Sequence, residues 1–196
     1  MARQHPPADR RQRQRAQVAE AVHEAVCAFA HDDGFGHCML YTLAGYMLLT
    51  KIDGDSWHMQ AGSASILADP PDGWWCYDAS TPAALARGEF HCWLAKRGRD
   101  PERPAALVDC STRHFHRMVD QMNAHGALSG GDHIPWTQTT EPPPFVWTDG
   151  EQSAWVHWQP LPELCRHLWV SVREDLLLYR PLLRLVTGRY RALVGR

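Results

Sequence analysis

Two hydrophobic patterns follow one another in the first quarter of the chain. Apolar side chains recur at intervals of four and three over residues 16–30, which predicts an amphipathic helix. Residues 38–49 are apolar on nearly every side, and this predicts a second helix that is buried in the core. Cys38 is the first residue of that run. The sequence therefore predicts a cysteine in the first turn of the most buried helix.

The middle of the chain contains short apolar runs that are separated by turn signals. The Pro-Pro-Asp-Gly sequence at residues 70–73 is a clear signal of this kind. The runs with strand character lie at residues 57–67, 74–77, 89–96 and 105–110. Because these strands are short and joined by turns, they predict an antiparallel sheet.

Helical and irregular segments alternate in the second half of the chain. Gly126 should end one helix and Pro181 should break another. The predicted segments are a helix from residue 112 or 113 to 123, a loop-rich region over 127–160 with edge strands around 145–148 and 154–158, a helix over 161–179, and a last amphipathic stretch over 182–193.

This order of elements predicts one α+β domain over residues 15–196. Residues 1–14 are polar and rich in arginine, so we expect a disordered tail, with a phosphate-binding basic arm as the alternative. The leucine-rich C-terminal helices are expected to belong to the core, and a homodimer contact between helices is the alternative.

Composition and charge narrow the classes of partner. The chain has 196 residues, a net charge of −2 and 44% hydrophobic residues, so neither disorder throughout nor binding to nucleic acid is indicated. It has no apolar run long enough to cross a membrane, and no apolar block follows the basic N-terminus as a secretory signal would require. We therefore expect a cytoplasmic protein without a membrane partner. Its six cysteines are scattered without a C-x-x-C pair, which predicts neither stable disulfides nor a metal or other cofactor.

Three side chains are candidates for nucleophilic chemistry. A thiol at a helix N-terminus beside an imidazolium loses its proton readily, and Cys38 has the helix position. Side chains alternate along a strand, so if Phe90 and Cys92 face the core, His91 faces the other side of the sheet. Asp109 ends the next apolar run, where a carboxylate can reach a neighbouring imidazole and orient it.

The order Cys, His, Asp carries little weight by itself, because the chain has six cysteines and twelve histidines. His37 adjoins Cys38, but consecutive residues at a helix start point in different directions, so we expect His37 to be a cap or a surface group. His114 and His116 lie two apart and do not share a helix face. A zinc site remains an alternative if four separate side chains converge: His58, His91, Cys92 and Cys110.

Two short motifs resemble the transglutaminase-like, broadly papain-like cysteine superfamily, which includes the arylamine N-acetyltransferases. They are H-C-W-L at residues 91–94 and V-D-C-S-T at residues 108–112, downstream of a cysteine that opens a helix. The resemblance covers about residues 32–112. It implies a buried helix that carries the cysteine and packs on an antiparallel sheet, with Cys38 as nucleophile, His91 as general base and acid, and Asp109 as the group that orients His91.

The implied activity is acyl transfer on a peptide or a small amide or acyl substrate, by a peptidase, an amidase or a transglutaminase-like transferase. The arginine and glycines that precede the cysteine in arylamine N-acetyltransferases are absent, which argues against acetyl-CoA. Trp57, Gln60 and Trp93 are candidate substrate contacts, and residues 127–160 would form a lid. A non-catalytic protein that binds a ligand or peptide on the same fold is the alternative function.

Overall fold

A computed structural model describes the chain over residues 8–54, 56–66, 74–77, 90–99, 103–124, 143–149 and 156–195. Its helices and strands are α1 (Ala8–Ala30), α2 (Cys38–Asp53), β1 (Trp57–Ile66), β2 (Trp74–Tyr77), β3 (His91–Lys96), β4 (Ala106–Asp109), the 3-10 turn η1 (Thr112–His114), α4 (Phe115–Ala124), β5 (Val146–Asp149), β6 (Val156–Pro160), α5 (Pro162–Glu174) and α6 (Arg180–Val194). The predicted α+β class is confirmed.

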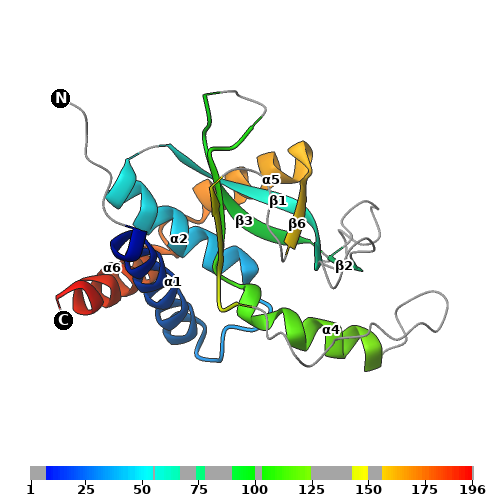
Figure 1. Ribbon diagram of the computed structural model, residues 1–196, viewed down its shortest axis with the longest axis horizontal. Helices are drawn as coiled ribbons and strands as arrows, with labels where there is room; N and C mark the ends of the chain where they lie inside the picture. The colour runs from blue at the N-terminus through cyan, green and yellow to red at the C-terminus, as the bar shows by residue number, and fades with distance from the viewer. Residues whose placement is uncertain are drawn as a thin grey trace.

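One antiparallel sheet joins all the strands of the described residues. Its main order is β2-β1-β3-β4-β5, and β6 pairs with β1. Helices α1, α2 and α6 gather on one side of this sheet, while α4 extends from its other end (Figure 1). The predicted strands at residues 74–77 and near 145–148 and 154–158 are present as β2, β5 and β6. In the described residues, no helix is both long and apolar enough to cross a membrane.

Helix α2 forms the centre of the core, as its apolar sequence predicts. Leu43 and Leu48 are buried against α1, α6 and the sheet. At Gly45 the helix comes so close to β3 that an added β-carbon would lie 2.9 Å from the side chain of Leu94. Because α2 packs directly on β3, the first residue of α2 lies beside the first residues of β3, where the candidate site is.

The predicted alternation of β3 is also present. Cys92 and Leu94 belong to the core cluster on the α2 side. His91 and Trp93 occupy the alternate positions and therefore face the other side of the sheet. Every residue of β3 from His91 to Ala95 is nevertheless buried, because both faces are covered.

Helix boundaries differ from the prediction at both ends of the chain. Helix α1 begins at Ala8 instead of residue 16, so residues 8–14 are helical and are not a disordered tail; residues 1–7 lie outside the described residues. Arg and Gln have high helix propensity, and Arg15 and Gln17 are anchored on Asp149 and on the carbonyl of Leu193. A polar, arginine-rich composition was therefore wrongly interpreted as disorder in the first turns of this helix.

At the C-terminal end, the predicted helix over 161–179 stops earlier. Helix α5 ends at Glu174, and Pro181 lies in the first turn of α6, where proline is well tolerated. Leu168 and Leu182 are buried, as expected for the core. Leu176, Leu177 and Leu178 lie between the two helices and are at least half exposed, contrary to the expectation that the leucines of this region belong to the core.

Gly62 is the position where a side chain would be least tolerated. A β-carbon there would lie 2.1 Å from the carbonyl oxygen of Gln159, across the β1–β6 pair. We expect Gly62→Ala to lower the free energy of unfolding by about 3 kcal/mol, because neither backbone can yield without breaking the pairing. Urea denaturation measures this change.

Gly188 provides the matched control, because it lies within α6 and an added β-carbon would meet nothing within 4 Å. Gly188→Ala should be neutral or stabilise by up to about 1 kcal/mol through helix propensity. Equal effects of the two substitutions would contradict the close approach of β1 and β6.

Candidate active site

Cys38 occupies the first position of α2. The N-cap residue, His37, makes no capping hydrogen bond with its side chain, and the first intrahelical bond runs from the amide of Tyr41 to the carbonyl of His37. The amides of the first turn therefore have no acceptor within the helix, and the positive end of the helix dipole lies at the same place. The Cys38 side chain is partly buried, and its Sγ lies 3.8 Å from the carbonyl oxygen of Phe90.

His91 and Asp109 form a buried hydrogen-bonded pair. Strands β3 and β4 pair with Leu94 opposite Val108, which brings the end of β4 beside the start of β3. His91 Nε2 lies 2.6 Å from Asp109 Oδ2, and the two side chains are 0% and 1% exposed. The pair therefore has a fixed geometry that solvent does not screen.

Cys38 completes this arrangement from the helix side. Its thiol interacts electrostatically with the imidazole of His91. Because Nε2 of His91 is already bonded to Asp109, Nδ1 is the nitrogen that is left for the thiol proton. The structure thus brings together the three predicted side chains, which are 53 and 18 positions apart in the sequence.

Charge stabilises the ionised form of each of the three groups. Burial alone would lower the pKa of His91, but the Asp109 carboxylate and the Cys38 thiolate raise it to about 10. Hydrogen bonds from the Cys92 thiol and from His91 hold the pKa of Cys38 well below its usual value, despite burial. Burial opposes ionisation of Asp109 too, yet its pKa is lowered by the charge and hydrogen bond of His91 and by Ser111. These directions favour a thiolate–imidazolium–carboxylate chain over three neutral groups.

Two residues that the sequence did not single out hold the Asp109 carboxylate. Ser111 donates its amide and its hydroxyl to Oδ1, at 2.9 and 2.7 Å. Trp158 donates its indole N–H to Oδ2, at 3.3 Å. The D-x-S spacing of Asp109 and Ser111 was a usable signal, since such local turns are common for Asp. No local signal existed for Trp158, which reaches the site through the long-range pairing of β6 with β1.

Trp93 and Gln60 are hydrogen-bonded to each other within the sheet, and Trp93 lies beside His91. The ring of Trp93 stacks near His91 at a centroid distance of 6.3 Å, and the side chain is 1% exposed. Its indole N–H donates to Gln60 Oε1 at 2.8 Å. Phe115 packs edge-on against His91 at 5.1 Å. Trp93 is therefore buried with Gln60 as its hydrogen-bond partner, and the contact of either residue with a substrate stays a prediction.

Trp57 lies away from Cys38. It pairs with Lys96 in the sheet, whereas His91 pairs with Gly62, so about 16 Å of strand separates the two positions. The indole packs edge-on against Trp147 and borders a separate cavity of about 410 Å³. Trp57 is therefore not placed beside His91, and its contact with a substrate stays a prediction. The predicted lid over 127–160 lies largely outside the described residues.

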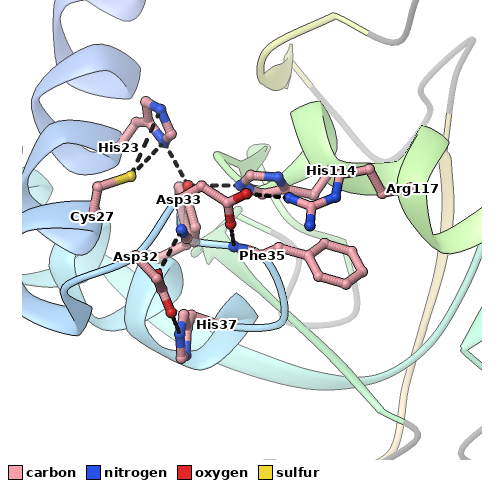
Figure 2. Close-up of polar contacts among 10 residues, drawn as sticks. His23, Cys27, Asp32, Asp33, Phe35, His37, His114 and Arg117 are labelled. Atoms are coloured by element: carbon pink, nitrogen blue, oxygen red, sulfur yellow. Dashed lines mark hydrogen bonds and ion pairs between the residues drawn. The ribbon is translucent and has the colours of Figure 1, made fainter.

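The loop before Cys38 is fixed by its own hydrogen bonds (Figure 2). His37 Nε2 lies 2.8 Å from Asp32 Oδ2, so its ring is engaged with Asp32 and not with Cys38. Asp33 accepts a hydrogen bond from the Phe35 amide and pairs with Arg117 of α4. This network determines the path by which the chain enters α2, and it removes His37 as a candidate base.

A second polar cluster, which includes His23 and His114, lies next to this loop in Figure 2. The hydroxyl of Tyr41 lies 2.6 Å from His23 Nδ1 and 2.9 Å from His114 Nε2. Burial and the neighbouring His23 lower the pKa of His114 to about 4. His114 therefore ties η1 to α2 as a neutral group, whereas His116 is exposed, as expected for two residues on different faces.

In the described part of the chain, no group of three or more His, Cys, Asp or Glu side chains is arranged to hold a metal ion. The zinc alternative required His58, His91, Cys92 and Cys110 to converge. His91 is instead bonded to Asp109, and Cys92 and Cys110 lie in the apolar core cluster. These four side chains therefore do not form a zinc site in the described part of the chain.

Comparison with known proteins adds information on the fold alone. No protein-family model and no curated protein matches the chain. A solved structure described as "The crystal structure of genomics APC5867" is similar, with a TM-score of 0.52 and 12% sequence identity over 91% of this chain and 77% of that chain. At this identity the similarity concerns the course of the backbone and carries no statement about activity.

Proposed function

We propose that the protein is a cysteine-dependent acyl-transfer enzyme with a papain-like or transglutaminase-like arrangement. The observation that carries the proposal is the position of His91, which is hydrogen-bonded to Asp109 and interacts electrostatically with the Cys38 thiol. A nucleophile, a base and a group that orients the base are the parts that such catalysis requires. The helix N-terminus at Cys38 supplies the fourth part, a set of amides without acceptors.

The reaction follows from these positions. The Cys38 thiolate attacks the carbonyl carbon of an amide, ester or thioester, and first-turn amides of α2 stabilise the oxyanion that develops. His91 donates its proton to the leaving group as the acyl-enzyme forms. It then accepts a proton from water or from an amine, which attacks the acyl group and releases Cys38. Asp109 keeps the imidazole in place and balances its positive charge throughout.

Exposure of the three groups suits this division of roles. Cys38 is partly exposed and can meet a substrate, whereas His91 and Asp109 are sealed from solvent by the surrounding rings. Because solvent does not reach His91 and Asp109, their charges are screened less than charges at the protein surface. The substrate class that fits is a peptide or a small acyl compound that approaches the start of α2.

Trapping of the acyl-enzyme tests the proposal. The intact protein is mixed with p-nitrophenyl acetate at pH 7, and nitrophenol release and protein mass are followed. We expect a rapid burst of about one nitrophenol per chain and an acetyl group on the peptide that contains Cys38.

Cys38→Ala should abolish the burst and Cys165→Ser should retain it, since the Cys165 thiol is hydrogen-bonded to the backbone carbonyl of Ala61. Acetylation spread evenly over several cysteines would contradict the proposal.

A ligand-binding protein is the second candidate, and the cavity beside Trp57 favours it. The cavity is lined by the indole rings of Trp57 and Trp147 and by the cationic side chains of Arg15 and Lys96. Its volume of about 410 Å³ lies in the range of small-molecule sites. If Cys38 fails to form an acyl-enzyme, this cavity is the place to seek a bound compound.

A further inference from the structure

We propose that Cys38 and Cys92 form a reversible dithiol–disulfide pair, in which Cys92 protects the nucleophile from peroxide. The inference deepens the proposed function and rests on it to the extent that it requires Cys38 to be the reactive thiolate. It assigns a role to a cysteine that the catalytic mechanism leaves unused.

The fold brings the two cysteines to the same contact between α2 and β3. Cys92 is on the core face of β3, which packs against α2, and Cys38 is the first residue of α2. Cys38 Sγ lies 3.8 Å from the carbonyl of Phe90, two residues before Cys92 on the same strand. The two thiols are close enough to interact electrostatically. A disulfide needs the sulfurs at about 2.05 Å, so bond formation requires a small approach by the first turn of α2.

The two cysteines differ in exposure and in ionisation. Cys38 is partly exposed, whereas Cys92 is 0% exposed. The hydrogen bond to Cys38 and burial raise the pKa of Cys92, while the pKa of Cys38 is lowered. A small oxidant therefore meets a thiolate at Cys38 and finds a protonated thiol behind it. This is the arrangement of an attacking and a resolving cysteine.

The chemistry balances with a hydroperoxide as the oxidant. The Cys38 thiolate attacks the peroxide and the O–O bond breaks; with one proton, this gives a sulfenic acid at Cys38 and releases water or an alcohol. The Cys92 sulfur then attacks the sulfenic sulfur, an S–S bond forms, and the hydroxyl leaves as water with the proton of the Cys92 thiol. Two equivalents of an external thiol reduce the bond and become one disulfide themselves.

The other described cysteines do not compete for this chemistry. Burial raises the pKa of Cys110 to about 12, and it raises the pKa of Cys27 and Cys165 as well. Cys165 is bonded to the backbone of β1, and Cys27 contacts His23 on α1. A thiolate with a thiol beside it occurs only at Cys38 within the described residues.

Peptide mapping after oxidation tests the proposal. The full chain is treated with a small excess of hydrogen peroxide at pH 7, free thiols are blocked, and peptides are analysed by mass spectrometry with and without dithiothreitol. We expect a Cys38–Cys92 linked peptide that disappears on reduction. In Cys92→Ser we expect at least about tenfold more irreversible sulfinic and sulfonic acid at Cys38 than in the wild type. Cys165→Ser is the control and should keep the link.

The readout separates this inference from the proposed function. If Cys38 forms an acyl-enzyme but the oxidised wild-type chain shows no Cys38–Cys92 link, the inference alone is overturned. If Cys38 forms no acyl-enzyme and resists peroxide as the other thiols do, the proposed function is overturned and the inference with it. Linkage of Cys38 to a different cysteine also overturns the inference. The wild-type result stands even if Cys92→Ser folds poorly.

Discussion

Replacement of His91 by alanine is expected to slow acylation of Cys38 at pH 7 by at least about 1000-fold. The substitution removes the positive charge that stabilises the thiolate and the imidazole that protonates the leaving group. It also leaves the Asp109 carboxylate buried with Ser111 and Trp158 as its remaining partners. Single-turnover kinetics with p-nitrophenyl acetate measure the loss.

His37→Ala is the matched control, because His37 is next to Cys38 in the sequence but is bonded to Asp32. We expect it to change the acylation rate by less than about threefold. If His37→Ala is as damaging as His91→Ala, the assignment of the base to His91 does not hold. If neither substitution matters, the triad is not functional.

Asp109→Asn is expected to lower the free energy of unfolding by about 3 kcal/mol near pH 5.5, because it breaks a fully buried ion pair. The difference between wild type and variant should depend on pH in two directions. The pKa of Asp109 is lowered in the folded state, so its contribution is complete above the unfolded value of about 4 and is lost as pH falls below it.

The contribution of His91 to stability depends on pH in the opposite direction. Its pKa is raised to about 10, so its contribution is complete below the unfolded value of 6.5 and is lost as pH rises from there toward 10. The stability difference should therefore be widest between about pH 4.5 and 6.5 and narrow on both sides. Urea denaturation across this range is the measurement. The control Asp149→Asn alters an exposed carboxylate and should show a small, level difference. If the difference in unfolding free energy between wild type and Asp109→Asn does not change with pH, a buried ion pair is contradicted.

The parts of the site that local sequence patterns can encode were predicted. An apolar run with a cysteine at its start indicated α2, and strand alternation placed His91 opposite the core face of β3. The carboxylate at the end of β4 followed from the same reasoning. These features depend on neighbours in the chain, so the sequence contains them directly.

The parts that depend on long-range pairing were not predicted. Trp158 reaches Asp109 only because β6 pairs with β1, and nothing near residue 158 indicates that pairing. The separation of Trp57 from His91 was not predicted for a related reason, since the register of β1 against β3 determines it. Cys92 was assigned only to the core face, but α2 and β3 approach closely enough at Gly45 to bring its sulfur to Cys38.

The ionisation of Cys38 is the central claim, and the pH dependence of its alkylation tests it most directly. Iodoacetamide is applied from pH 5 to 9, and the rate constant for the Cys38 peptide is compared with that for a model thiol. A free cysteine with a pKa of about 8.5 is roughly 0.3% thiolate at pH 6, so a preformed thiolate of equal nucleophilicity should react about 300-fold faster there. The account predicts a Cys38 rate that is nearly constant from pH 6.5 to 9. A rate that rises about tenfold per pH unit, in parallel with the model thiol, would contradict it.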